Sequence, residues 1–111
     1  MKAIVNDSFG GPEVMRVASV PEPTPGPGQV LVRVAATSVN RPDVIQRQGN
    51  YPPPPGDSNI LGLEIAGTVA ALGDGVDQWR CGDRVMGLVG GGAYAEFSVA
   101  WPGHLMRIPE S

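Results

Sequence analysis

The sequence predicts a mainly β domain, a partly open barrel of about six to eight short strands with one or two short helices. Short runs rich in valine, isoleucine and leucine recur along the chain, and turns rich in glycine and proline separate them. The 16 glycines and 12 prolines lie between these runs and not in one biased tract. A chain of 111 residues is long enough to form one domain with its own core.

An opening hairpin and a long strand are the first expected elements. Residues 2–5 and 14–20 read as two short strands, joined across a turn at 9–12 whose glycines allow the positive φ of a tight connection. A stiff, proline-rich link over 21–28 then leads to a strand over 29–39. In this strand a valine-lined face alternates with a mixed face, which is typical of a strand that packs one side on the core.

A short helix followed by a stiff loop is expected next. Pro42 suits the first turn of a helix, Asp43 suits its positive end, and Gly49 can end it in a left-handed conformation. The prolines at 52–55 force an extended backbone that cannot enter the interior of a sheet. Tyr51 is therefore expected at the mouth of a stiff loop, where its hydroxyl can form part of a pocket wall.

An apolar run over 60–72 carries one carboxylate, Glu64. A strand that is buried on both faces excludes glutamate unless the side chain is paired or functional. We expect Glu64 to be paired with an arginine, for which Arg41, Arg47 and Arg84 are the candidates. General acid or base catalysis by Glu64 is the alternative.

The last third of the chain is expected to add further strands. Turns rich in glycine and aspartate separate its segments. In order, these are two strands over 76–80 and 84–89, a strand over 93–100 and a short segment over 104–108. Neither an internal repeat nor a domain boundary is evident.

Charge and composition argue against several classes of partner. The formal net charge is −3 and the eight basic residues are scattered, so nucleic acid and anionic membrane surfaces are not expected as partners. The sequence has no apolar stretch of membrane-spanning length and no signal peptide, so a cytoplasmic location is expected. The single cysteine, Cys81, excludes an internal disulfide and a multi-cysteine zinc site within this chain.

Three motifs occur together and in one order between residues 40 and 67. They are Asn40-x-x-Asp43, Arg47-x-Gly49-x-Tyr51 and Gly62-Leu63-Glu64-x-Ala66-Gly67. Further matching segments at 28–32, 82–85 and 92–96 extend the pattern over essentially the whole chain. In this combination the sequence resembles the N-terminal half of the zinc-independent quinone oxidoreductases, the zeta-crystallin-like branch of the medium-chain dehydrogenase/reductase superfamily.

The resemblance implies a GroES-like fold, with residues 1–111 forming the substrate-side, catalytic domain of an NADPH-dependent quinone or enone reductase. Members of this family continue into a nucleotide-binding Rossmann domain. Its glycine pattern is absent here, because the glycines at 90–92 lack the spacing and precede strand-like residues. The isolated chain is therefore expected to be inactive, and the full-length form is expected to be a homodimer.

Two positions argue against a catalytic zinc ion. Zinc-dependent relatives hold the metal with a cysteine and a histidine of this domain, and the matching positions here are Asn40 and Leu63. An amide is a poor ligand for zinc, and an isobutyl group is none. We therefore expect no metal. The cofactor would supply the hydride, and hydrogen-bond donors would orient the carbonyl-like substrate.

The resemblance also implies roles for the polar residues. As catalytic residues, Asn40 is expected to donate its amide to the substrate or the nicotinamide, and Tyr51 to pack against or donate to a ring substrate. Asn40 and Asp43 are expected on the cofactor side, although helix capping alone would explain both. Glu64 and Arg47 are expected as supporting buried charges, and interaction with the helix dipole suffices for Arg47.

Two other functions fit a barrel of this size. A co-chaperonin subunit is a structural protein that needs a mobile apolar loop, whereas the loop around Tyr51 is stiffened by prolines. A free-standing binding or dimerising module would expose a contiguous apolar patch. A ring-shaped oligomer in gel filtration would favour the co-chaperonin.

Overall fold

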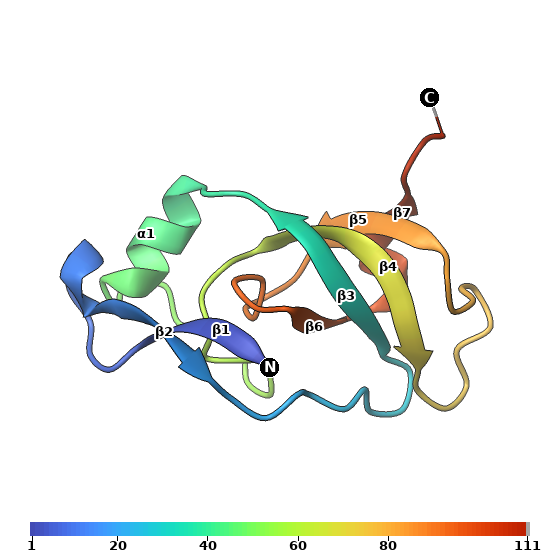
Figure 1. Cartoon of the computed structure of the whole chain (residues 1–111), viewed down its shortest axis with the longest axis horizontal. Coiled ribbons are helices and arrows are strands. Elements are labelled where there is room, and N and C mark those ends of the chain that lie inside the picture. Colours follow the sequence, from blue (N-terminus) through green and yellow to red (C-terminus); the bar gives the residue numbers. More distant parts are fainter. Residues whose placement is uncertain (111) are drawn as a thin grey trace.

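Two antiparallel sheets and one α-helix make up the computed structural model, which describes residues 1–110 (Figure 1). The two-stranded sheet pairs β1 (Lys2–Asn6) with β2 (Met15–Ser19). The five-stranded sheet has the order β6-β3-β4-β5-β7. Its strands are β3 (Val30–Thr37), β4 (Glu64–Leu72), β5 (Arg84–Leu88), β6 (Phe97–Ala100) and β7 (Leu105–Arg107). The helix α1 (Arg41–Arg47) follows β3, and the 3-10 turns η1 (Pro12–Val14) and η2 (Pro102–His104) precede β2 and β7.

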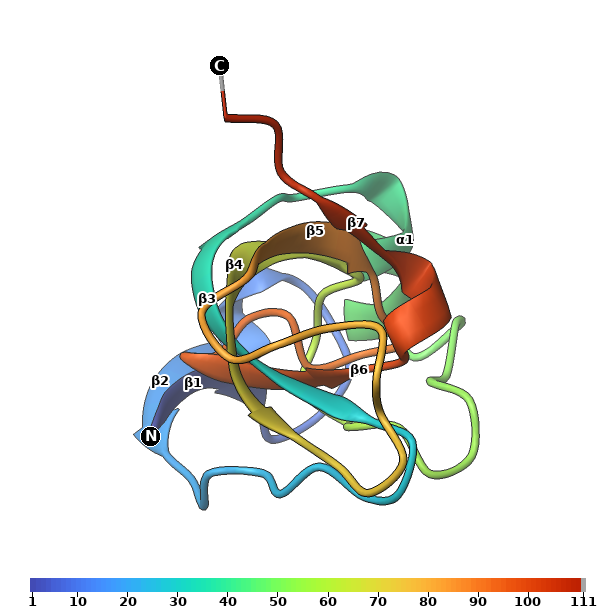
Figure 2. The same ribbon diagram turned by 90° about the vertical axis from the view of Figure 1, so that its right-hand side faces the viewer.

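The larger sheet curls around an interior without closing, which confirms the predicted partly open barrel. Strands β6 and β7 lie at its two edges, and no pairing joins them within residues 1–110. Figure 2 shows how β3, β4 and β5 wrap around the space that β6 crosses. A bridge between Ala3 and Ala95 joins the small sheet to the loop before β6.

Aliphatic side chains from every strand of the larger sheet fill the interior. Val30, Val32 and Val85 have no exposed surface, and Val69 on β4 lies opposite Val32 in the antiparallel register. The valine alternation predicted for β3 is thereby confirmed, because β-branched residues pack well on a pleated surface that faces a core. The other buried members of this cluster are Ile65, Ala93, Ala100 and Leu105.

Helix α1 ends as the sequence predicts. Gly49 has a φ of +87°. Its N–H donates to the Gln46 carbonyl at 2.9 Å, and the N–H of Asn50 donates to the Ile45 carbonyl at 3.0 Å. These two bonds form a Schellman motif, which satisfies the last carbonyl groups of a helix. The chain then turns sharply into the proline-rich loop.

Two expected strands differ in the structure. Residues 76–80 form no strand, and Trp79 instead packs against the core while its Nε1 donates to the carbonyl of a residue in η2 at 3.1 Å. The strand expected over 93–100 is limited to β6, because the preceding residues turn towards the small sheet. There the N–H of Ile4 donates to the Tyr94 carbonyl at 2.8 Å.

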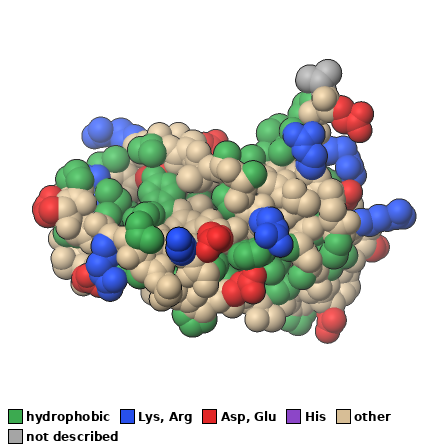
Figure 3. All heavy atoms as spheres, viewed as in Figure 1, with side chains coloured by type: hydrophobic (Ala, Val, Ile, Leu, Met, Phe, Trp, Pro, Cys, Tyr) green, Lys and Arg blue, Asp and Glu red, His purple; other side chains and the backbone are tan. Residues whose placement is uncertain are grey.

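The surface carries mixed charge. On the face drawn in Figure 3, acidic and basic side chains are interspersed among polar and apolar ones. The two ion pairs found within residues 1–110 are Arg16 with Asp7 and Arg107 with Asp83. None of the described helices is long and apolar enough to span a membrane.

Gly67 marks a close approach between β4 and β3 that offers a test of this register. A Cβ at Gly67 would lie 2.0 Å from the carbonyl oxygen of Arg33. We expect Gly67→Ala to lower the free energy of unfolding by about 2 kcal/mol, because the strands must shift to accept the methyl group. Urea denaturation measures this change.

Gly103→Ala is the matched control, since a Cβ there would meet nothing within 4 Å. Its expected effect is within about 0.5 kcal/mol. Equal losses of stability in the two variants would contradict the steric explanation.

Candidate functional site

The link between β3 and α1 places Asn40 at the start of the helix, where its side chain reaches β4. The amide nitrogen of Asn40 donates to Glu64 Oε2 at 2.7 Å and to Ser38 Oγ at 2.9 Å. The Ser38 hydroxyl donates to the same carboxylate oxygen. A carboxylate only accepts hydrogen bonds. The Asn40 amide must therefore point its nitrogen, and not its oxygen, towards Glu64. Both N–H bonds of that amide are therefore engaged within the chain.

Glu64 differs from the expectation in its burial and in its partners. Its side chain is half-buried, not buried, and Ser38 and Asn40 occupy the place expected for an arginine. Neither ion pair of the described residues includes Glu64. The predicted arginine pairing is thus wrong. The antiparallel register, which sets Thr37 opposite Ile65, brings the neutral donors after β3 directly to the first residue of β4.

These hydrogen bonds favour the ionised form of Glu64. The Ser38 hydroxyl, followed by the Asn40 amide, lowers the pKa of the Glu64 carboxyl group below its ordinary value. Glu64 is consequently a carboxylate at neutral pH, which disfavours its use as a general acid. The charge is held in a fixed position by two donors.

Asp43 lies beneath the start of α1, with a side chain only 2% exposed. Its Oδ2 accepts the backbone N–H of Asn40 at 3.1 Å and the hydroxyl of Tyr94 at 2.6 Å. An acidic side chain that accepts the N-terminal N–H from the third helical position is one half of a capping box. The capping alternative therefore accounts for Asp43, whose buried carboxylate offers almost no surface to the cofactor contact expected from the sequence.

Tyr94 is a site residue to which the sequence analysis gave no role. It lies in the loop before β6, and its hydroxyl donates to Asp43. Burial, and then the hydrogen bond to Asp43, raise the pKa of Tyr94 well above its ordinary value, so the phenol remains a donor. The signal in the sequence was its place in the matching segment at 92–96.

Tyr51 and Arg47 lie at the opposite end of α1 from Asn40, and the helix of seven residues separates its ends by about 10 Å. Arg47 Nε donates to the Gly10 carbonyl at 3.0 Å, so this half-buried side chain joins α1 to the loop before η1. Tyr51 is 49% exposed. Within the described residues, no hydrogen bond links Tyr51 to Asn40 or Glu64.

The chain has two hollows, of about 810 and 250 Å³. Gln46, Gly49 and Pro52, near Tyr51, help to line the smaller hollow, and Leu88 helps to line the larger one. Neither hollow is lined by Asn40, Tyr51 or Glu64. The structure thus brings Asn40 and Glu64 together but does not place Tyr51 with them in a pocket of this chain. Any pocket that uses all three needs a further surface.

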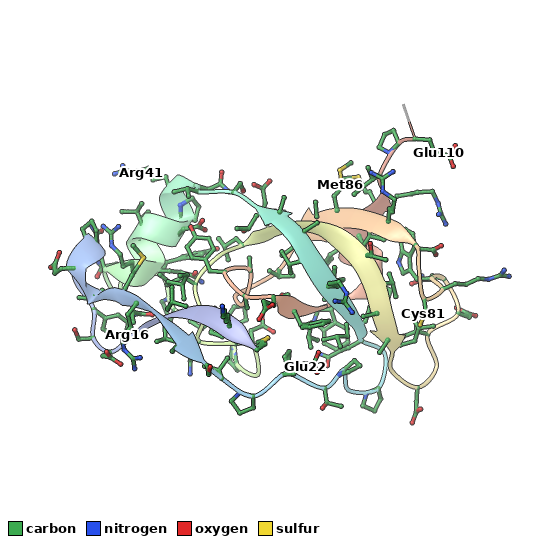
Figure 4. All side chains as sticks on the ribbon, in the orientation of Figure 1. Arg16, Glu22, Arg41, Cys81, Met86 and Glu110 are labelled. Carbon is green, nitrogen blue, oxygen red and sulfur yellow. The ribbon has the colours of Figure 1, made fainter. Side chains whose placement is uncertain are left out.

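Exposed apolar side chains flank the polar contact. Val39, which precedes Asn40, is 81% exposed, and Leu88, which lies opposite Glu64 on β5, is 59% exposed. We call these two residues, with Ser38, Asn40 and Glu64, the Asn40–Glu64 site. In Figure 4, Arg41 at the start of α1 points outward on the same upper side of the molecule as Met86 of β5. The site combines a fixed negative charge with an accessible apolar surface.

Tyr94→Phe tests the support of Asp43, because it removes the donated hydroxyl and keeps the ring. We expect the free energy of unfolding at pH 7 to fall by about 1–3 kcal/mol, since a buried carboxylate loses a donor. Urea denaturation provides the measurement. Tyr51→Phe, at a largely exposed position, should change stability by less than about 0.5 kcal/mol. A Tyr94→Phe variant as stable as the parent would refute the role of Tyr94.

Ser38→Ala tests the origin of the Glu64 charge. The lowered folded-state pKa means that the Ser38 and Asn40 bonds contribute stability at pH values above 4.5, the ordinary value, and that this contribution is lost as the pH falls through the folded-state pKa. Ser38→Ala should raise the pKa of Glu64 in a carboxyl-carbon NMR titration and flatten the fall in stability on acidification.

The control is Ser19→Ala on β2, an exposed serine remote from Glu64. It should leave the Glu64 titration unchanged. The assignment fails if Glu64 titrates at the same pH in the Ser38→Ala variant and in the parent.

Known proteins similar in sequence to this chain include quinone oxidoreductases and other dehydrogenase-like proteins. Residues 26–110 match the alcohol dehydrogenase GroES-like domain. A quinone oxidoreductase of Lama guanicoe is 39% identical over 112 residues, which cover 98% of this chain and 34% of that protein. The human synaptic vesicle membrane protein VAT-1 homolog-like is 37% identical over 110 residues, which cover 99% of this chain and 26% of that protein. The chain thus spans about a quarter to a third of the length of these curated relatives.

Solved structures agree with the sequence relatives. A quinone oxidoreductase of Pseudomonas syringae pv. Tomato superposes with a TM-score of 0.89 at 39% identity, covering 99% of this chain and 34% of that one. A mycobacterial protein complexed with NADPH superposes with a TM-score of 0.90 at 37% identity, covering 100% of this chain and 34% of that one. The GroES-like fold and the kinship implied by the motifs are confirmed, and the chain belongs to the alcohol dehydrogenase GroES-like domain family.

Proposed function

We propose that this chain is the substrate-side domain of an NADPH-dependent reductase of quinones or activated enones that works without zinc. The observation that carries the proposal is the Asn40–Glu64 site, where an amide and a fixed carboxylate lie between two exposed apolar side chains. Relatives named quinone oxidoreductase and a mycobacterial relative complexed with NADPH support the reaction class and the cofactor. A ring substrate would pack on the apolar side chains, beside the charged group.

The residues of this chain suit a supporting contact to the cofactor better than they suit the main cofactor-binding site. Helix α1 starts at Asn40-Arg41-Pro42, without the glycines that let a pyrophosphate approach the N-terminus of a helix. We therefore assign the binding of the pyrophosphate to a Rossmann domain outside residues 1–111. When bound, NADPH supplies the hydride, and its nicotinamide ring becomes positively charged. The Glu64 carboxylate would favour that positive charge electrostatically.

Asn40 has a different proposed role from the one expected. Because both of its N–H bonds are engaged with Ser38 and Glu64, it cannot donate to a substrate without releasing one of them. We assign Asn40 to holding the Glu64 carboxylate in place. Asp43 and Tyr94 then act through Asn40, by fixing the start of the helix that carries it.

The donor set of the site does not suit a zinc ion. Leu63 beside Glu64 offers no ligand atom, and the amide nitrogen of Asn40 faces the carboxylate. Residues 1–110 contain no group of three or more His, Cys, Asp or Glu side chains that could hold a metal. Activation of the substrate in this proposal rests on orientation and electrostatics, which good hydride acceptors such as quinones tolerate.

Glu64→Gln tests the proposal in a complete reductase that carries this domain. The substitution keeps the shape of the side chain and removes its charge, so we expect kcat for NADPH oxidation with p-benzoquinone to fall about 10-fold or more. The melting temperature should fall only slightly, because the hydrogen bonds from Ser38 and Asn40 lose their charged acceptor. The 111-residue chain alone should oxidise no NADPH.

Glu22→Gln is the matched control, because Glu22 lies on the lower edge of the molecule in Figure 4, on the side opposite Arg41 and Met86. Its kcat should equal that of the parent enzyme. Full turnover by the Glu64→Gln enzyme, or turnover by the isolated chain, would contradict the proposal.

A further inference from the structure

The hollow of about 810 Å³ lies between β6, η2, the glycine bend at 90–92 and the loop at 54–58. Figure 2 shows this light-green loop and η2 on the same side of β6. Ser38, Asn40 and Glu64 do not line the hollow, and Leu88 is the one residue of the Asn40–Glu64 site that does. Its volume falls in the range of small-molecule sites in proteins.

Ser98 gives this hollow an unused polar group. Its side chain is 2% exposed, it lines the hollow, and its Oγ has no hydrogen-bond partner within residues 1–110. A buried hydroxyl without a partner is unfavourable, and most buried hydroxyls in proteins are bonded. A ligand atom that reaches Ser98 Oγ would therefore gain a hydrogen bond that the free chain lacks.

The neighbours of this hydroxyl are small or apolar. Ser98 lies opposite Val32 of β3, whose side chain cannot form a hydrogen bond. Gly92 lies on another side of Ser98. A Cβ at Gly92 would lie 3.4 Å from Ser98 Oγ and 3.1 Å from the Cβ of Ser58. A side chain at position 92 would therefore crowd Ser98, and the φ of +96° favours glycine there.

The walls of the hollow suit a flat apolar molecule. Phe97 and Trp101 line it, as do prolines of the link after β2 and of the loop after α1. Aromatic rings and prolines are rigid surfaces, and planar compounds stack on the former in offset or edge-to-face geometry. Trp101 is 48% exposed, so part of its ring is accessible to a ligand.

The charges of the lining balance one another. Asp57 contributes a carboxylate, and Met1 contributes its α-ammonium group, which donates to the Val20 carbonyl at 2.8 Å. His104, at the exposed end of η2, is the remaining titratable side chain, and no lysine or arginine lines the hollow. An ionic ligand would therefore find no net countercharge.

We propose that this hollow binds an uncharged, planar ring compound with one hydroxyl or carbonyl group, which hydrogen-bonds to Ser98. A serine hydroxyl both donates and accepts, so it serves either group. This site is distinct from the reaction site proposed above, because Leu88 is the one residue that lines the hollow and also belongs to the Asn40–Glu64 site.

Titration of the 111-residue chain with 2-naphthol, followed by amide NMR, tests the proposal. We expect saturable shift changes at the signals of Phe97–Ala100 and Trp101, and none at Asn40 or Glu64. Naphthalene, which lacks the hydroxyl, is the comparison ligand and should bind about 5–10-fold more weakly, as expected for the loss of one hydrogen bond.

Ser98→Ala should weaken the binding of 2-naphthol about 5–10-fold and leave the binding of naphthalene unchanged. The variant removes an unsatisfied hydroxyl, so it should be at least as stable as the parent, which urea denaturation can verify. Ser19→Ala is the matched control and should bind both compounds like the parent. Shift changes centred on Asn40 and Glu64, no saturable binding, or equal affinity of the parent and Ser98→Ala for 2-naphthol would overturn the proposal.

Discussion

Burial of the Asp43 carboxylate is the constraint on which the arrangement of this domain depends. Moving a carboxylate out of water is costly unless donors replace the lost hydrogen bonds. Here the donors come from the backbone of Asn40 and from the hydroxyl of Tyr94, which lie on different parts of the chain. The start of α1 and the loop before β6 must therefore keep their relative positions. The barrel encloses an aliphatic core, but this polar contact fixes the helix against it.

A chain of hydrogen bonds extends the constraint to the surface. Tyr94 bonds to Asp43, Asp43 bonds to the backbone of Asn40, and the side chain of Asn40 bonds to Glu64. These bonds hold the members of the network in one geometry, although Asp43 Oδ1 has no hydrogen-bond partner within residues 1–110. The charge of Glu64 is thus positioned by groups that never touch a substrate. Its apolar neighbours, Val39 and Leu88, remain exposed beside it.

Two regions of the domain differ in how their hydrogen-bond donors are used. At the Asn40–Glu64 site the amide and hydroxyl donors are engaged, so their effect is to orient one carboxylate. In the large hollow the Ser98 hydroxyl is buried and unengaged, which makes it a group that a ligand can satisfy. The first arrangement suits electrostatic support of a reaction, and the second suits recognition of a neutral compound.

The sequence by itself determined the strand alternation of β3, both ends of α1 and the family, because these depend on neighbours in the chain: side-chain period, a proline at the helix start and a glycine at its end. Only the tertiary structure decided the partners of Glu64 and Asp43 and the part played by Tyr94. Asn40 and Glu64 are 24 residues apart in sequence, and Asp43 and Tyr94 are 51 apart. Contacts at such separations are set by strand register and loop packing, which no local pattern encodes. The same reason applies to residues 76–80, where Trp79 packs against the core and no strand forms.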